Sequence, residues 1–324
     1  MKKILKIILP LLFGIGLLIY FLSGFTDEQY HEVYESIRKA NLWWVLVSVI
    51  LGIVSHIIRA LRWDYLLEDF ADHPPKKWNL ILSVGLSYLI NLGIPRSGEI
   101  ARAVTLSKYE KLSFAKVMGT ILAERIIDML ILAAFILWGL FLEFPTIYDL
   151  LKKNFPDFSW HHLGGGLIAI LIFLLIFFIY IKKSSHHIAV KLRNFIDDII
   201  KGLFSVLHSR HKWAFLVQTI IIWFLYLLML YVVMLGFEST RNLPLRAVLL
   251  VFIAGSLSIV LSNGGIGTYP VFVTETLLLY GVSKADGFAF SITMWTAQTL
   301  ILILFGLFSI IMLPLINKTA NASF

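Results

Sequence analysis

The stretch that decides the fold is AVLLVFIAGSLSIVL-SNGGIG-TYPVFVTETLLLY, which occupies residues 247–280. Two apolar pieces, Ala247–Leu261 and Thr268–Tyr280, flank the glycine-rich break Ser262–Gly267. As helices of about 15 residues they reach about 22 Å each, short of a hydrocarbon core about 30 Å thick. A helix cannot pass such a break without freeing backbone groups. We therefore predict a re-entrant hairpin with its tip buried in protein near mid-membrane. Two short tilted spans joined by a glycine kink are the open alternative.

A second break of the same kind lies earlier in the chain. The apolar residues Trp78–Ile94 and Ile100–Leu106 flank Pro95–Glu99, which contains a proline and a glycine. Proline removes a backbone donor and favours an interruption of the helix. The pattern predicts another re-entrant hairpin at this position.

The composition places the whole chain in a membrane. Of its 324 residues 59% are hydrophobic and only 15% are charged, against about 25% in ordinary soluble domains. These numbers exclude a soluble or disordered chain, and the length leaves no room for a large synthase or kinase domain beside the apolar segments. There is no cysteine, which excludes disulfides, thiolate zinc sites and a cysteine nucleophile. We attribute the net charge of +8 to cytoplasmic Lys and Arg rather than to nucleic-acid binding.

Uninterrupted apolar runs long enough to cross a bilayer complete the predicted fold. The first follows Lys2 and Lys3 and is too long for a signal peptide, so we interpret it as an uncleaved anchor. The fold class is an all-α polytopic membrane protein with about six full spans plus two broken re-entrant hairpins related as an inverted repeat. The predicted spans are Ile4–Leu22, Leu42–Leu61, Phe114–Leu142, Leu163–Ile181, Trp213–Leu235 and Phe288–Leu315.

Two further segments, of which 187–208 is an interfacial amphipathic helix, are predicted to be packing elements rather than sites. Residues 187–208 carry apolar side chains along one helical face. Residues 26–40 open with Thr26-x-x-Gln29, which is a capping-box pattern for a helix start.

The order of helix, broken hairpin and long helix occurs twice. Repeat A covers about residues 42–142 and repeat B about residues 213–315, within a single membrane domain of residues 1–324. The loop charges make the first copy begin outside and the second inside, which is an inverted-topology repeat as found in secondary transporters.

Ionisable residues at membrane depth mark the candidate site. They lie at the first break and on the following span, and an intramembrane charge predicts function because it is expensive unless paired or hydrated. Glu124 and Asp128 are four residues apart and share one helix face. The alternative is a neutral network that only joins the hairpin to the span. The residues are Arg96, Glu99, Arg102, Glu124, Arg125 and Asp128.

The hairpin tips predict an anionic ligand. At each tip the second half-helix begins with unpaired N–H groups and the positive end of its dipole, and such starts bind phosphates and carboxylates. Arg96 and Arg102 add cations suited to phosphate oxygens, so the firmer grip is expected at the first hairpin. The other residues predicted to line the site are Gly98, Asn263, Gly264, Gly265, Gly267, Thr268, Tyr269 and, on the last span, Gln298.

These motifs together resemble a known family. Arg96-x-Gly-Glu-x-x-Arg102, Ser113-Phe114, Glu124-Arg125-x-x-Asp128 and Gly264-Gly265-Ile266-Gly267 are similar to the lysylphosphatidylglycerol synthase transmembrane-region, or flippase-like, family. That family includes the membrane domain of the multiple peptide resistance factor. The resemblance implies a protein that flips aminoacylated phospholipids or related lipids between leaflets. Asn263 departs from the family, which often has proline there, and the family's cytosolic aminoacyl-transferase domain is not expected in this chain.

Three functions follow from the sequence. The first is a flippase or scramblase whose polar cleft carries an anionic or aminoacylated headgroup. The second is a non-transporting scaffold of an envelope glycolipid pathway, and the third is a small-solute or proton-coupled carrier that uses Glu124 and Asp128. No enzyme activity, cofactor, metal or nucleic acid is expected. The expected partners are membrane phospholipids, with the oligomeric state, a homodimer included, left open. The expected location is a bacterial or archaeal cytoplasmic membrane.

The topology gives a direct test. Both termini, residues 62–77 and residues 182–212 are expected in the cytoplasm, because these segments hold most of the basic residues. A single cysteine placed at Ser185 should therefore resist a membrane-impermeant thiol reagent in intact cells and react after lysis. Labelling from outside would contradict this topology.

Overall fold

The computed structural model describes residues 2–68, 71, 73–94, 97–145 and 210–317, with isolated positions at 148, 152, 172, 180, 182, 184, 186, 187, 189, 190 and 193. Every element in these ranges is a helix. The chain forms two compact units, one of residues 1–121 with 209–324 and one of residues 122–208. The predicted span Leu163–Ile181 and the amphipathic segment 187–208 lie almost wholly outside the described residues.

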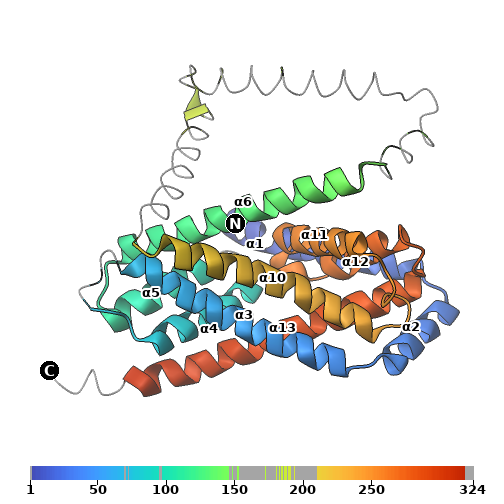
Figure 1. The fold of residues 1–324 in the computed structure, drawn as a ribbon, viewed down its shortest axis with the longest axis horizontal. Coiled ribbons are helices and arrows are strands. Elements are labelled where there is room, and N and C mark those ends of the chain that lie inside the picture. The colour runs from blue at the N-terminus through green and yellow to red at the C-terminus, as the bar shows by residue number, and fades with distance from the viewer. Residues whose placement is uncertain are drawn as a thin grey trace. The chain divides into compact units, whose positions relative to one another are not determined.

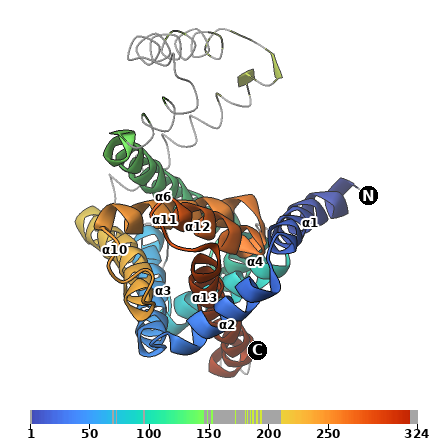
Figure 2. The same cartoon turned by 90° about the vertical axis from the view of Figure 1, so that its right-hand side faces the viewer.

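Four helices are long and apolar enough to cross a membrane, which confirms four predicted spans. They are α3 (Trp43–Leu67), α6 (Phe114–Leu142), α10 (Lys212–Gly236) and α13 (Lys284–Asn317). In the first unit α3 packs against α10 along its length, and the views agree on this arrangement (Figures 1 and 2). The total number of spans and the inverted relation of the two repeats stay predictions.

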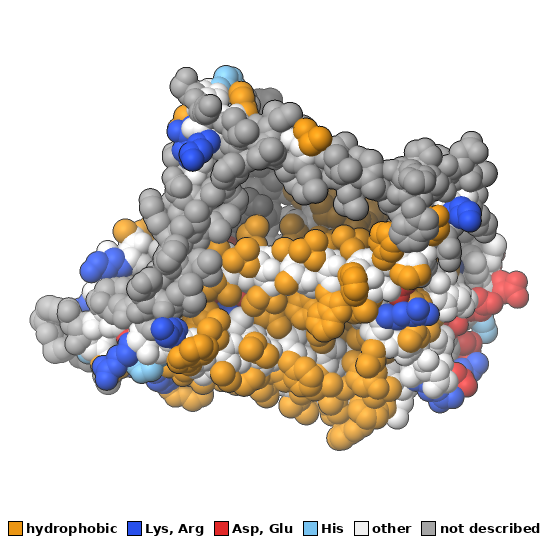
Figure 3. All heavy atoms as spheres, turned by 45° about the horizontal axis from the view of Figure 1, so that its top comes forward, with side chains coloured by type: hydrophobic (Ala, Val, Ile, Leu, Met, Phe, Trp, Pro, Cys, Tyr) orange, Lys and Arg blue, Asp and Glu red, His pale blue; other side chains and the backbone are white. Residues whose placement is uncertain are grey.

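The outer faces of these helices are apolar. Exposed side chains on α13 recur every three or four residues, at Leu300, Leu304, Leu307, Ile311 and Leu315. Figure 3 shows hydrophobic side chains gathered over the helices on one face. Soluble proteins rarely expose apolar patches of more than a few hundred Å². The stripes are therefore explained by contact with lipid.

The chain forms a helical hairpin at both predicted breaks, and the re-entrant placement of these hairpins stays a prediction. The first consists of α4 (Lys77–Gly93) and α5 (Ser97–Glu110), and its two helices pack against each other. The second consists of α11 (Leu245–Leu261), the short 3₁₀ helix η1 (Asn263–Gly265) and α12 (Thr268–Leu278), and again the two α-helices pack together. The chain therefore folds back at both breaks. Pro95 and Arg96, at the first break, lie outside the described residues.

The break in the second hairpin depends on glycine. Gly264, Gly265 and Gly267 have φ angles of 62°, 78° and 74°, in the left-handed region that side chains disfavour. This backbone ends α11 and restarts the helix at Thr268 within six residues. The Ser-Asn-Gly-Gly-Ile-Gly sequence is therefore the local cause of the hairpin.

Helices α1 (Lys2–Ser23) and α2 (Asp27–Lys39) meet at a bend of 109° between Leu9–Ser23 and Asp27–Lys39. The predicted capping box is confirmed, because the Gln29 N–H donates to Thr26 Oγ1 and the Thr26 N–H donates to Gln29 Oε1. Helix α2 has no buried residue, as expected of a surface helix.

An aromatic cluster fixes the end of α1. Phe21 and Phe25 pack against Phe288 of α13, with ring centroids 6.0 and 5.7 Å away. The Lys284 ammonium lies over both rings of α1, at 4.4 and 4.6 Å from their centroids. Cation–π contacts of this kind are worth about 0.5–2 kcal/mol. The C-terminal half of α1 is thereby tied to the start of α13, whereas its N-terminal end projects from the bundle (Figure 2).

Helix α1 also crosses the tip of the second hairpin at very close range. A Cβ atom built on Gly14 overlaps the Ile266 carbonyl oxygen, and one built on Gly267 overlaps the Gly14 carbonyl oxygen. The two backbones therefore touch without any side chain between them. Gly16, one half-turn away, has nothing within 4 Å of its built Cβ.

Helix α3 runs further than predicted. The span was expected to end at Leu61, with Arg62 in a cytoplasmic segment, but the helix continues to Leu67 and Arg62 is fully buried. The placement of Arg62 in a loop is wrong because its guanidinium packs 4.9 Å from the Phe215 ring centroid of α10 and donates to Thr219 Oγ1. Because α10 supplies these partners, Arg62 can be buried and α3 can continue past it.

The glycine crossing predicts opposite effects of two small changes on one helix. Gly14→Ala should destabilise the protein by about 1–3 kcal/mol, because the added methyl group overpacks against the hairpin backbone. Gly16→Ala is the matched control and should be neutral or stabilise by up to about 1 kcal/mol, since it adds a better helix former in open space. Thermal unfolding of the purified variants in detergent measures both. Equal stability of the two variants would show that the close crossing is absent.

Candidate functional site

The start of α5 at the first tip is capped by its own hairpin. The Gly98 N–H donates to Asn91 Oδ1 at 2.8 Å and the Ser97 N–H donates to the Ile94 carbonyl at 3.2 Å. A Cβ built on Gly98 overlaps the Ser87 carbonyl oxygen and lies 2.6 Å from the Asn91 amide, so only glycine fits this approach of α5 to α4. Gly98 therefore serves helix packing, and its N–H is already used.

Arg102 is buried next to α3. Only 5% of its surface is exposed, and its guanidinium lies 3.7 Å from the ring centroid of Trp63. The indole N–H of Trp63 donates to Thr120 Oγ1 at 2.9 Å, which fixes the ring that Arg102 covers. Glu99, three residues earlier on α5, is partly buried. Arg102 is thus held inside the helix bundle at the position predicted for a phosphate-binding cation.

The other half of the predicted charged network lies on α6. Glu124, Arg125 and Asp128 share one uninterrupted helix within the second unit. Their convergence with Glu99 and Arg102, which belong to the first unit, and with Arg96 stays a prediction.

Hydroxyl groups hold the second tip together. Ser262 Oγ and Thr268 Oγ1 are hydrogen-bonded at 2.6 Å across the glycine turn, and Thr268 Oγ1 also donates to the Ser258 carbonyl at 2.9 Å. The Trp295 indole N–H of α13 donates to the Gly264 carbonyl at 2.9 Å. These contacts close the turn and place the start of α12 beside the end of α11.

The two hairpins meet at this tip. Helix α4 contacts η1, and a Cβ built on Gly264 lies 2.9 Å from Leu92 Cδ2 near the end of α4. Two segments more than 150 residues apart in the sequence are therefore adjacent, as the prediction of a site between hairpins requires.

The side chains of two predicted site residues make contacts within the helix bundle. The side chain of Tyr269 lies in the apolar cluster beneath the second hairpin and its ring touches Gly255 of α11. The Gln298 amide donates to Ser48 Oγ of α3 at 3.0 Å. Both side chains support the scaffold of the tip in this structure.

A row of buried cations on α3 was missed by the sequence reasoning. Arg59 and Arg62 are 8% and 0% exposed, and Arg59 Nη1 donates to Tyr226 Oη of α10 at 3.3 Å. One turn earlier, His56 is buried with its ring centroid 4.6 Å from that of Tyr88. The spacing of three residues from His56 to Arg59 to Arg62 within an apolar run is the signal that could have found them, because it places all three near one face.

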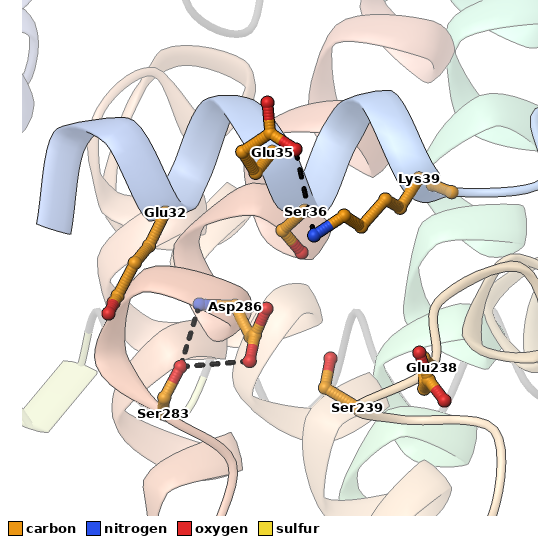
Figure 4. A pocket seen from close by; sticks show the side chains of 9 residues that line it. Glu32, Glu35, Ser36, Lys39, Glu238, Ser239, Ser283 and Asp286 are labelled. Atoms are coloured by element: carbon orange, nitrogen blue, oxygen red, sulfur yellow. Dashed lines mark hydrogen bonds and ion pairs between the residues drawn. The ribbon is translucent and has the colours of Figure 1, made fainter.

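The structure also contains a polar recess that the sequence did not predict. A cavity of about 510 Å³ lies between α2, the turn after α10 and the start of α13 (Figure 4). Three of its carboxylates have local partners: Glu35 pairs with Lys39 at 3.6 Å, Glu238 with Arg241 at 3.4 Å, and Asp286 accepts from Ser283 Oγ at 2.9 Å. The side chains of Glu32, Ser36 and Ser239 complete the wall. Each of these pairs lies within one helix or turn.

Comparison with known proteins confirms the resemblance drawn from the motifs. The family profile described as "Lysylphosphatidylglycerol synthase TM region" matches residues 7–306. A UPF0104 membrane protein of Methanothermobacter thermautotrophicus is 25% identical over 187 residues, which are 55% of this chain and 51% of that protein. The UPF0104 membrane protein MJ1595 of Methanocaldococcus jannaschii is 27% identical over 147 residues, 44% of this chain and 43% of its own. The chain spans about half the length of these relatives, and no solved structure matches it.

Proposed function

Because this chain belongs to the family of the lysylphosphatidylglycerol synthase transmembrane region, we propose that it moves phospholipids or related lipids with anionic or aminoacylated headgroups between the two leaflets. It acts as a flippase or scramblase, with the headgroup passing among polar side chains inside the bundle while the acyl chains stay in lipid. No bond is made or broken in such a step, so the proposal is transport and not catalysis.

The observation that carries the proposal is the set of arginines buried inside helices whose outer faces are apolar. Arg59, Arg62 and Arg102 are at most 8% exposed, whereas the stripes on α13 and α10 face outward. Burying a cation costs several kcal/mol before its contacts offset the cost. Aromatic rings and hydroxyl groups hold these guanidinium groups in place. Guanidinium groups bind phosphate oxygens through two parallel hydrogen bonds, which suits a phospholipid headgroup.

The contact between the two hairpin tips supports a path for the headgroup at the level of these tips. Half-helices end at Gly93 and Leu261, and new helices begin at Ser97 and Thr268. Such interrupted helices bring polar backbone groups to mid-membrane, where transporters place their substrate sites. We propose that Arg96 and Arg102 bind the phosphate, and that Glu124 and Asp128 orient the arginines or bind an amine on the headgroup.

Removal of one arginine tests the proposal. In liposomes that contain a fluorescent phospholipid, Arg102→Ala should slow leaflet exchange by at least about tenfold, because one charge-assisted pair with phosphate contributes about 1.5–3 kcal/mol. Arg102→Lys should rescue poorly, since lysine lacks the planar group that covers Trp63. Chemical reduction of the outer label measures the exchange.

Arg241→Ala is the matched control, because the Arg241 side chain is exposed and pairs with Glu238 on the same turn. It should exchange lipid at the parent rate. If a folded Arg102→Ala also does so, the phosphate assignment of Arg102 is wrong. If the parent moves no lipid of any headgroup class, the scaffold function replaces transport.

A further inference from the structure

At the second hairpin tip, several N–H donors of buried residues have no acceptor in the part of the chain that the structure describes. Within the described residues, no oxygen accepts a hydrogen bond from the N–H groups of Gly267, Thr268 or Tyr269, and no side chain caps α12. All three residues are buried. The first N–H groups of a helix cannot be satisfied within that helix, and buried N–H groups almost always have partners. Three adjacent exceptions therefore indicate a missing acceptor.

A side chain at the same turn points to the same conclusion independently. Asn263 is only 4% exposed, and its Nδ2 has no hydrogen-bond partner among the described residues. The Ile266 N–H donates to the Asn263 carbonyl, and the neighbouring Ser262 hydroxyl is bonded to Thr268. These two bonds close the turn that contains Asn263 directly before α12. The amide donor and the three N–H groups thus belong to one turn.

Three of the carbonyl groups around this turn already accept a hydrogen bond. The Gly264 carbonyl accepts from Trp295, the Asn263 carbonyl from Ile266, and the Ser258 carbonyl from Thr268. Water brings donors as well as an acceptor, so it suits a site with both kinds of group. A site in which several donors gather at one turn suits a group that only accepts, and the positive end of the α12 dipole favours a negative one.

We infer that the tip of the second hairpin is a binding site for a phosphate-type oxyanion, held by the N–H groups of residues 267–269 and by Asn263 Nδ2. The inference rests on the proposed function and names the chemical group that the transport path recognises. The first tip differs, because Asn91 and Ile94 already accept from Gly98 and Ser97. The main-chain anion site therefore lies on the hairpin that lacks arginines at its tip, contrary to the expectation of a firmer grip at the first hairpin.

Substitution of Asn263 by aspartate tests the site with little change of shape. The purified chain in detergent is titrated with dihexanoyl phosphatidylglycerol, with dihexanoylglycerol, which has no phosphate, and with sodium phosphate, and its unfolding temperature is followed. The phospholipid should stabilise the parent and dihexanoylglycerol should not. Asn263→Asp should lower the affinity for the stabilising ligand by at least about tenfold, because a carboxylate replaces the amide that donates to the anion. The matched control Asn242→Asp, on an exposed turn, should bind like the parent.

The three titrations distinguish a lipid headgroup from a free phosphate ion as the ligand. Stabilisation by the phospholipid alone assigns the site to a lipid headgroup, and equal stabilisation by sodium phosphate assigns it to a free anion. If neither ligand stabilises the parent, or if Asn263→Asp binds as the parent does, the inference is overturned. Gly267→Ala is not used, because Gly267 needs its positive φ and touches Gly14.

A second measurement needs no variant. Hydrogen exchange of a peptide covering residues 262–274 should slow by at least about tenfold at the amides of residues 267–269 when the stabilising ligand is bound, because each gains an acceptor. Unchanged exchange would overturn the site even if Asn263→Asp fails to fold. Liposome assays keep the two proposals apart. Asn263-dependent anion binding without lipid exchange refutes only transport, and lipid exchange without such binding refutes only the site.

Discussion

The rest of the structure depends on the need to satisfy backbone N–H and C=O groups where no water is present. A straight helix does this internally, but each broken helix creates a new set of orphan groups. The first break uses the side chain of Asn91 and the Ile94 carbonyl as acceptors. At the second break, hydroxyl groups close the turn and Trp295 donates to one carbonyl, but the first donors of α12 have no acceptor among the described residues. The same constraint that permits hairpins only inside protein is thus also the basis of the anion site that we propose.

A second constraint acts on the cations. Arg62 and Arg102 are buried against the aromatic faces of Phe215 and Trp63, which attract a guanidinium through the ring quadrupole without adding a second charge. These rings are held in turn by helix packing, as the bond from Trp63 to Thr120 shows. The position of Arg62 therefore depends on α3 and α10 packing side by side (Figures 1 and 2). The position of Arg102 depends on the Trp63 ring of α3, which Thr120 of α6 holds in place.

The sequence predicts the breaks well because their cause is local. The positive φ of Gly264, Gly265 and Gly267 ends the helix locally, so the turn of the second hairpin could be predicted from its own residues. The capping box of α2 is confirmed for the same reason, because its two residues are three apart in the sequence. A proline alone is a weaker signal, since Pro10 and Pro314 lie inside helices. The predicted end of α3 was wrong because a charged residue indicates a loop only when no partner allows it to be buried. The partners of Arg62 lie on α10, more than 150 residues away in the sequence. The Gly14 crossing was equally hidden, since one glycine in an apolar helix has no distinctive pattern. Packing between distant segments decides both features.

The buried arginines and the uncapped N–H groups lie on different elements, which bears on how a headgroup could pass. A site that joined arginines and main-chain donors at one point would hold a phosphate firmly, and a path conducts only if each site binds weakly enough to release. Here the buried guanidinium groups gather around α3 and α5, whereas the uncapped N–H groups belong to α12. Leu92 touches the turn at Gly264, so the two sets lie on elements that are in contact. In the transport that we propose, two partial sites on adjoining elements would let a phosphate exchange one set of partners for the other, and neither set would have to offset the whole cost of its desolvation alone.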